Sequence, residues 1–228
     1  MAVTLRRSPP RQVDSSQLAT LPRLPETADE IRSIAVAMSA DLTKDVFLGV
    51  QANEKTVRTT DLSRYRVIAF ATHGLVAGDL DGLTQAALAL TSPEVANVSG
   101  DGLLTVDKIL ELRLNADWVV LSACNTASGQ GAGSEAISGL GRAFFYASAR
   151  SLLVSSWPVE TTSARALTTD LFKRQAANPQ QGRAQALLET MNSLIDEGGY
   201  VDPRSGQIVF SYAHPIFWAP FILVGDGG

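Results

Sequence analysis

Long apolar runs and amphipathic stretches alternate along this chain. Residues 66–72, 117–123 and 151–156 are apolar at both odd and even positions, which is typical of strands covered on both faces. Shorter apolar runs predict a strand at 45–49 and another, at 221–224, that closes the sheet. These patterns together predict a central sheet whose strands are largely buried.

The stretches between these runs carry apolar residues three and four positions apart, the spacing of one helix face. The first predicted helix, 27–39, starts with Thr27 and Glu30 in a capping-box arrangement. Asn53 is expected to cap a helix that reaches residue 62, and further helices are predicted at 106–112, 137–148, 161–175 and 183–197. This alternation predicts a layered α/β domain with a mostly parallel sheet and right-handed crossovers.

Composition divides the chain of 228 residues into a short lead and one large domain. The lead contains Pro9, Pro10, Pro22 and Pro25, and such a density of proline favours extended chain. We therefore expect a Pro-rich tail or linker at 1–26 and a single domain at 27–228.

Charge and cysteine content narrow the partners and the compartment. A net charge of −4 is the wrong balance for a surface that follows phosphates, so nucleic acid is not an expected partner. Membrane association is not expected either, because no uncharged apolar run is long enough to span a bilayer. One cysteine and two histidines make neither a disulfide nor a cysteine-rich zinc site. Residues 1–12 lack the apolar stretch of a secretory signal, which predicts a cytoplasmic location.

Reactive side chains follow two of the predicted parallel strands. The strand at 66–72 leads into His73 and Gly74, and the strand at 117–123 leads into Cys124. Ligands of open parallel sheets bind beyond the carboxyl ends of the strands. If these two strands are neighbours, strand spacing places His73 and Cys124 within side-chain reach of each other. A Cys/His dyad is then possible.

The two groups suit acyl transfer. A thiol with a pKa near 8.5 is partly thiolate at neutral pH, and an imidazole near 6.5 takes and returns protons in the same range. The backbone amides of Gly74 and Cys124 would hold the oxyanion of a tetrahedral intermediate. A lone cysteine at a strand end is more often a small apolar filler, so the hypothesis depends on both residues occurring together.

Other motifs have competing interpretations. Residues 131–136 fit the outline G-x-G-x-x-A, but the first glycine follows Cys124 by seven positions, so a dinucleotide site is disfavoured. Asp79 would line a pocket for a basic side chain, or lie in a solvated turn, which we favour. Trp157 would pack against bound peptide or in the core. His214, before a proline and far from any predicted strand end, is expected to be structural.

Several separated motifs resemble those of CHAT domains, in the same order. They are Ala69-Phe70-Ala71-Thr72-His73-Gly74, Asp101-Gly102-Leu103-Leu104-Thr105, Val119-Val120-Leu121-Ser122-Ala123-Cys124-Asn125-Thr126, the stretch from Gly139 to Phe145, Ser155-Ser156-Trp157-Pro158-Val159 and Trp218-Ala219-Pro220-Phe221. CHAT domains are caspase-like domains commonly found with tetratricopeptide repeats in bacteria. His precedes Cys by 51 positions here, close to the separation and order in caspases.

The resemblance implies a caspase-like three-layer fold, with a mostly parallel sheet and helices on both faces. It also implies a clan CD cysteine peptidase that cleaves protein or peptide substrates without metal or organic cofactor. His73 and Cys124 correspond to the dyad and Gly74 to an oxyanion donor. A repeat region or regulatory protein is the implied partner, and a catalytically silent interaction module is the alternative.

Two departures from the family pattern stand out. Ser122 occupies the position where caspases carry a substrate-binding Gln, so a preference for aspartate does not carry over. Ser122, Trp157 and Asp79 remain candidate substrate contacts. Family members also carry an additional strand upstream of Thr27, which residues 13–21 would have to supply if the sheet is complete.

Overall fold

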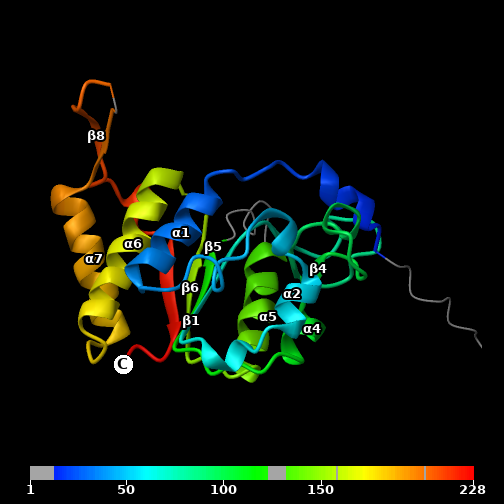
Figure 1. Cartoon of the computed structure of the whole chain (residues 1–228). Coiled ribbons are helices and arrows are strands. Elements are labelled where there is room, and N and C mark those ends of the chain that lie inside the picture. The colour runs from blue at the N-terminus through cyan, green and yellow to red at the C-terminus, as the bar shows by residue number, and fades with distance from the viewer. Residues whose placement is uncertain (1–12, 123–131, 158, 203) are drawn as a thin grey trace, which may run out of the picture.

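A four-stranded sheet in the order β1-β5-β6-β9 forms the centre of the fold (Figure 1). The computed structural model describes residues 13–122, 132–157, 159–202 and 204–228, with the backbone alone at 132–138. Strands β1 (Val67–Ala71), β5 (Trp118–Ser122) and β6 (Ser151–Ser155) run parallel. Strand β9 (Phe221–Gly225) pairs antiparallel with β6. The sheet is therefore mostly parallel, as predicted.

Helices cover both faces of this sheet (Figure 1). Trp118 and Val120 pack towards α1 (Thr27–Ala37), α6 (Thr161–Ala177) and α7 (Arg183–Glu197). Val119 and Leu121 point to the other face, against α4 (Val106–Leu110) and α5 (Ala132–Tyr146). Alternate residues of one strand thus bury into two different cores, which is why the strand is apolar at both parities. The predicted three-layer architecture is confirmed.

A small antiparallel sheet lies beside the central one and was not predicted. It joins β2 (Gly74–Leu75), β3 (Ala87–Ala89) and β4 (Leu103–Thr105). Each of these strands has two or three residues, too few for a periodic pattern to be recognised. Because β2 begins at Gly74, the chain is held in this small sheet directly after His73.

The amino-terminal lead packs against this small sheet. Residues 15–20 form the 3-10 helix η1 (Ser15–Thr20), so no missing strand of the sheet is supplied by 13–21. Leu18 is buried together with Leu75 and Leu103. The Asp14 amide donates to the Asp81 carbonyl at 3.0 Å. Part of the proline-rich lead is therefore held on the domain by a buried leucine and a backbone hydrogen bond.

The predicted strand at 45–49 is wrong. The Asp45 amide donates to the Asp41 carbonyl at 2.8 Å, and the Asp45 carboxylate accepts from the Asp41 amide at 2.9 Å. These bonds close a turn before Val46, which is buried alone. The remaining elements are η2 (Gly49–Gln51), α2 (Glu54–Thr59), η3 (Leu62–Arg64), α3 (Pro93–Ala96), η4 (Pro215–Phe217) and the projecting hairpin of β7 (Gly199–Val201) and β8 (Ile208–Ser211).

Gly102 provides a test of how tightly the lead is packed. Its φ is +74°, and a Cβ there would lie 2.7 Å from Leu18 Cδ1 and 3.1 Å from Pro93 Cδ. We expect Gly102→Ala to destabilise the protein by about 1–2 kcal/mol more than Gly78→Ala, measured by urea unfolding. Gly78 is the matched control, since its φ is +93° but no atom lies within 4 Å. If both variants lose the same free energy of unfolding, the positive φ accounts for the loss and the contact with Leu18 does not.

Candidate active site at the carboxyl ends of β1 and β5

Strands β1 and β5 are parallel neighbours, and the end of one lies beside the end of the other. Their register pairs Ala71 with Ser122, the last residue of each strand. His73 follows two residues after Ala71, and Cys124 two residues after Ser122. The adjacency on which the dyad hypothesis depends is therefore confirmed for the strands, while Cys124 itself lies outside the described residues.

The His73 ring is held by a backbone carbonyl. Its Nε2 lies 2.7 Å from the carbonyl oxygen of Pro22. A carbonyl only accepts, so Nε2 carries the proton and the Nδ1 of the neutral ring is left as an acceptor. The contact fixes both the tautomer and the orientation of the imidazole, as a partner on the other ring nitrogen does in many functional histidines.

The backbone around His73 is fixed as well. The Ala89 amide donates to the His73 carbonyl at 2.9 Å, and the Thr72 hydroxyl donates to the Ala89 carbonyl. Gly74 follows directly as the first, buried residue of β2, where it pairs in register with Leu88. The small sheet therefore anchors the chain on the carboxyl side of the histidine. The part of Gly74 as an oxyanion donor remains a prediction.

Pro22 reaches the histidine because the chain between η1 and α1 crosses the end of the central sheet (Figure 1). The Gln17 side chain accepts from the Asp81 amide at 2.8 Å, which ties the lead to the loop that follows β2. Sequence reasoning missed Pro22, since a backbone carbonyl leaves no signal in side-chain chemistry. The Pro22 carbonyl comes to lie beside His73 only because the lead packs on the domain.

Ser122 contacts a buried carboxylate. Its hydroxyl donates to Glu30 Oε2 at 2.9 Å, and the Thr168 hydroxyl lies 3.5 Å from Glu30 Oε1. Burial raises the pKa of Glu30 above its ordinary value, and the two hydroxyl hydrogen bonds offset this only in part. The end of β5 is thus joined through Glu30 to α1 and α6.

The sequence pattern assigned Glu30 a different role, in a capping box. In the structure Thr27 is already helical and Glu26 occupies the N-cap position. Glu30 is therefore the fourth helical residue, one position further into the helix than the capping box requires, and it lies four residues before the buried Ile34 on the same face. That i, i+4 relation with an apolar position is the signal that would have predicted its burial.

The other two candidate substrate contacts, Asp79 and Trp157, make no hydrogen bond or ion pair with these groups in the described part of the chain. The Asp79 carboxylate accepts from the Val76 amide at 2.7 Å within an exposed turn. Trp157 follows β6 and is 40% exposed, so its side chain is not part of the core. His214 caps η4 through Nδ1, which accepts from the Ile216 amide at 3.2 Å and agrees with the structural role expected of it. Within the described part of the chain, no hydrogen bond or ion pair joins Asp79 or Trp157 to His73.

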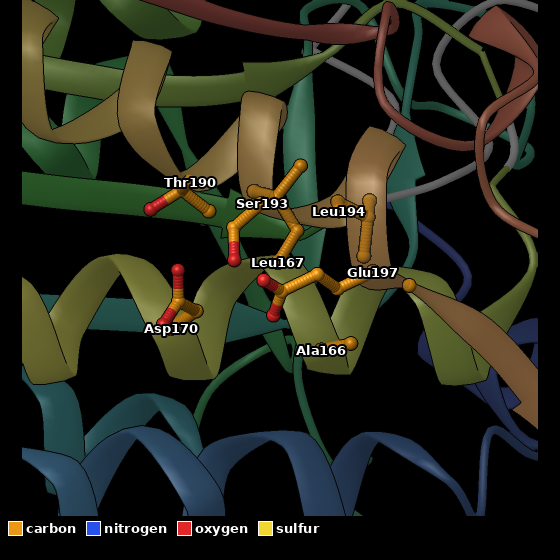
Figure 2. Close-up of a pocket in the computed structure, with 8 residues that line it drawn as sticks. Ala166, Leu167, Asp170, Thr190, Ser193, Leu194 and Glu197 are labelled. Atoms are coloured by element: carbon orange, nitrogen blue, oxygen red, sulfur yellow. The ribbon is translucent and has the colours of Figure 1, made fainter.

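A pocket of about 220 Å³ lies elsewhere, between α6 and α7 (Figure 2). Asp170 and Glu197 contribute carboxylates to its lining. Asp170 is already paired with Arg174 at 2.7 Å. None of the site residues above lines this pocket, so we assign it no part in the chemistry at the strand ends.

Among the described residues, no group of three or more His, Cys, Asp or Glu side chains is arranged to hold a metal ion. No helix in the described part of the chain is both long and apolar enough to cross a membrane.

Comparison with known proteins identifies the family. The CHAT domain family model matches residues 3–226, which is nearly the whole chain. The chain is also 28% identical over 128 residues to tetratricopeptide repeat protein 28 of Mus musculus. That match covers 54% of this chain and 4% of the mouse protein, so the chain corresponds to a small part of its relative. The mostly parallel sheet, with the register that pairs Ala71 with Ser122, is consistent with this match. The chain therefore belongs to the CHAT domain family of caspase-like domains, which often occur with tetratricopeptide repeats.

Proposed function

We propose that this domain is a cysteine endopeptidase that cleaves protein substrates through His73 and Cys124. The observation that carries the proposal is the β1–β5 register. The register pairs Ala71 with Ser122, and in the sequence His73 and Cys124 each follow one of these two residues by two positions, which supports the proposed dyad. Adjacent parallel strands lie about 4.8 Å apart, a separation that two side chains can bridge.

The ring geometry supports a proton-transfer role for His73. With Nε2–H donated to Pro22, the ring exchanges its second proton at Nδ1. The Cys124 thiol gives its proton to Nδ1, and the thiolate attacks the scissile carbonyl carbon. The carbonyl oxygen becomes an oxyanion, which the Gly74 and Cys124 amides would hold. The C–N bond then breaks as Nδ1–H protonates the leaving amine, and an acyl-enzyme remains.

Water completes the cycle. His73 takes a proton from water at Nδ1 while the water oxygen attacks the thioester carbon. The C–S bond breaks, the acid product leaves, and the thiolate is regenerated. A reducing compartment such as the cytoplasm, in line with the single cysteine, would keep this thiol free. An extended substrate would lie across the strand ends, within reach of the exposed Trp157.

Regulation by a partner is part of the proposal. The mouse relative is named for its tetratricopeptide repeats and is far longer than this chain. We infer that a repeat region or a regulatory protein controls the activity of this domain, as the association of CHAT domains with tetratricopeptide repeats suggests.

Covalent labelling tests the proposal directly. A peptidyl acyloxymethyl ketone is incubated with the full chain, and the modified residue is identified by mass spectrometry. We expect one adduct at Cys124, lost in His73→Ala because the thiol then lacks its base. His214→Ala is the matched control and should label normally, since His214 only caps η4.

Two results would contradict the proposal. Equal labelling of Cys124 with and without His73 would indicate simple thiol reactivity, without a dyad. No labelling of the intact chain by ketones of any side-chain class would favour the silent interaction module instead.

A further inference from the structure

Three carboxylates of the described chain are buried, and Glu30 differs from the other two. Glu54 is 5% exposed and lies 2.8 Å from the Lys108 ammonium. Asp117 is 6% exposed and pairs with three arginines. Glu30 is 4% exposed, yet no ion pair within the described ranges includes it. Its contacts are two neutral hydroxyls, from Ser122 and Thr168.

An unpaired buried carboxylate is costly, because burial removes its hydration without supplying a counter-charge. Two basic side chains of α1 and α6, Arg32 and Arg165, pair instead with Asp29, the residue that precedes Glu30. Arg32 lies 3.4 Å from the Asp29 carboxylate, and Arg165 lies 3.9 Å from it. These two arginines therefore pair with the exposed acid, and the buried one is left without a charged partner among the described side chains.

Glu30 lies directly behind the proposed catalytic edge. Ser122, its hydrogen-bond donor, is the last residue of β5 and is only half-buried. Ser122 pairs in register with Ala71, two residues before His73. One hydrogen bond thus separates the carboxylate from the accessible end of the strand. A cation bound against Ser122 would meet a negative charge that none of the described side chains compensates.

We propose that Glu30 selects substrates with a basic side chain, arginine or lysine, on the residue whose carbonyl is attacked. The inference rests on the proposed peptidase function and names its substrate class. That side chain is attached next to the reacting carbonyl, so it enters the sheet edge where Ser122 and Glu30 lie. Its charged end would serve as the counter-ion of Glu30, as Lys108 does for Glu54 and the arginines do for Asp117. Glu30 acts as a specificity residue and takes no part in bond cleavage.

Steady-state hydrolysis of matched peptides tests this selection with the full chain. Four fluorogenic peptides differ only at the residue before the cleaved bond, which is arginine, lysine, citrulline or norleucine. Citrulline keeps the shape of arginine but has no charge. We expect kcat/KM for arginine to exceed that for citrulline by about 30-fold or more. Glu30→Gln should reduce this ratio at least tenfold, mainly through KM, with the norleucine peptide cleaved as before.

A matched control and a stability measurement distinguish an effect of Glu30 on substrate selection from an effect on the stability of the fold. Asp29→Asn removes one charge from the neighbouring, exposed position of the same helix and should leave the ratio unchanged. Thermal unfolding at pH 7 should show Glu30→Gln melting at the same or a higher temperature, since the amide keeps hydrogen-bonding capacity and removes a buried charge. A Glu30 that merely stabilises the fold would instead lower the melting temperature.

Failure of the proposed selection by Glu30 can be distinguished from failure of the peptidase proposal. If citrulline and norleucine peptides are cleaved as well as the arginine peptide, the selection by Glu30 is overturned and the peptidase proposal stands. A ratio that is unchanged in Glu30→Gln also overturns it. If no peptide is cleaved and Cys124 is not labelled, the peptidase proposal fails first and the inference falls with it.

Discussion

Replacing His73 with alanine should lower kcat/KM for peptide hydrolysis by about 10³-fold, within the range for loss of general acid–base catalysis. The reason is that one imidazole serves both half-reactions, first as acid towards the leaving amine and then as base towards water. The ring is already oriented for this by the Pro22 carbonyl, 2.7 Å from Nε2. Turnover of a cleaved peptide, followed by fluorescence, measures the loss.

Cys124→Ala should abolish turnover entirely, because no other cysteine occurs in the chain. The double variant should be no worse than Cys124→Ala, since residues that act as one unit are not additive. His214→Ala should retain wild-type turnover. A His73→Ala protein that kept its circular-dichroism spectrum and stayed within tenfold of the wild type would remove His73 from the mechanism.

Asp117 is the position at which we expect a single substitution to destabilise the fold most. It precedes β5 at the edge of the sheet opposite to the candidate site and is 6% exposed. Arg66 Nε lies 2.6 Å from one carboxylate oxygen, and Arg150 and Arg183 lie 2.5 and 3.3 Å from the other. The carboxylate thereby joins the starts of β1, β5 and β6 to α7.

Asp117→Ala should lower the free energy of unfolding by about 2–4 kcal/mol, measured by urea denaturation. The value lies towards the lower end for a broken buried pair because Arg66 and Arg150 remain more than half exposed to water. Arg183 is only 14% exposed and would keep only its pair with Asp226. Asp170→Ala removes one exposed i, i+4 pair with Arg174 and should cost about 0.5 kcal/mol or less. Equal losses in the two variants would contradict this account of Asp117.

The Asp117 contribution should also depend on pH. Burial alone would raise the pKa of Asp117, but the hydrogen bond and charge of Arg66, with Arg150 and Arg183, outweigh it and hold the pKa below its ordinary value. A lowered pKa in the folded state stabilises the protein above the unfolded value of about 3.9, and the contribution is lost as the pH falls through the folded pKa. Urea curves of Asp117→Asn should therefore move towards those of the wild type as the pH falls below the unfolded value of about 3.9.

Several elements follow from local pattern alone. The helix predicted at 183–197 has the observed bounds, and β1, β5 and β6 fall within the predicted runs. Asn53 caps α2 as expected, with its side chain accepting from the Thr56 amide. These features depend on residues close together in the chain, where hydrophobic period and capping chemistry act directly. Adjacency of β1 and β5 also follows from the tendency of consecutive parallel strands to lie side by side.

Other elements depend on distant partners and were wrong or missed. The run at 45–49 is apolar enough for a strand, but the hydrogen bonds of Asp45 close a turn instead. The small sheet is made of strands two or three residues long that become ordered only by pairing with each other and packing on Leu18. Local pattern carries no information on such pairing, because the pairing energy comes from residues far away in the sequence.

The amino-acid sequence by itself determined the layered α/β class, the three parallel strands and the placement of His73 and Cys124 after two of them. Hydrophobic period and strand-end position suffice for those features, because each is a property of a continuous segment. Only the tertiary structure decided that a carbonyl from Pro22 orients His73 and that Glu30, which the local pattern assigned to a helix cap, is buried behind Ser122 with no cation among the described side chains. Both contacts join segments that are 51 and 92 residues apart, so they arise from packing, which no local pattern encodes.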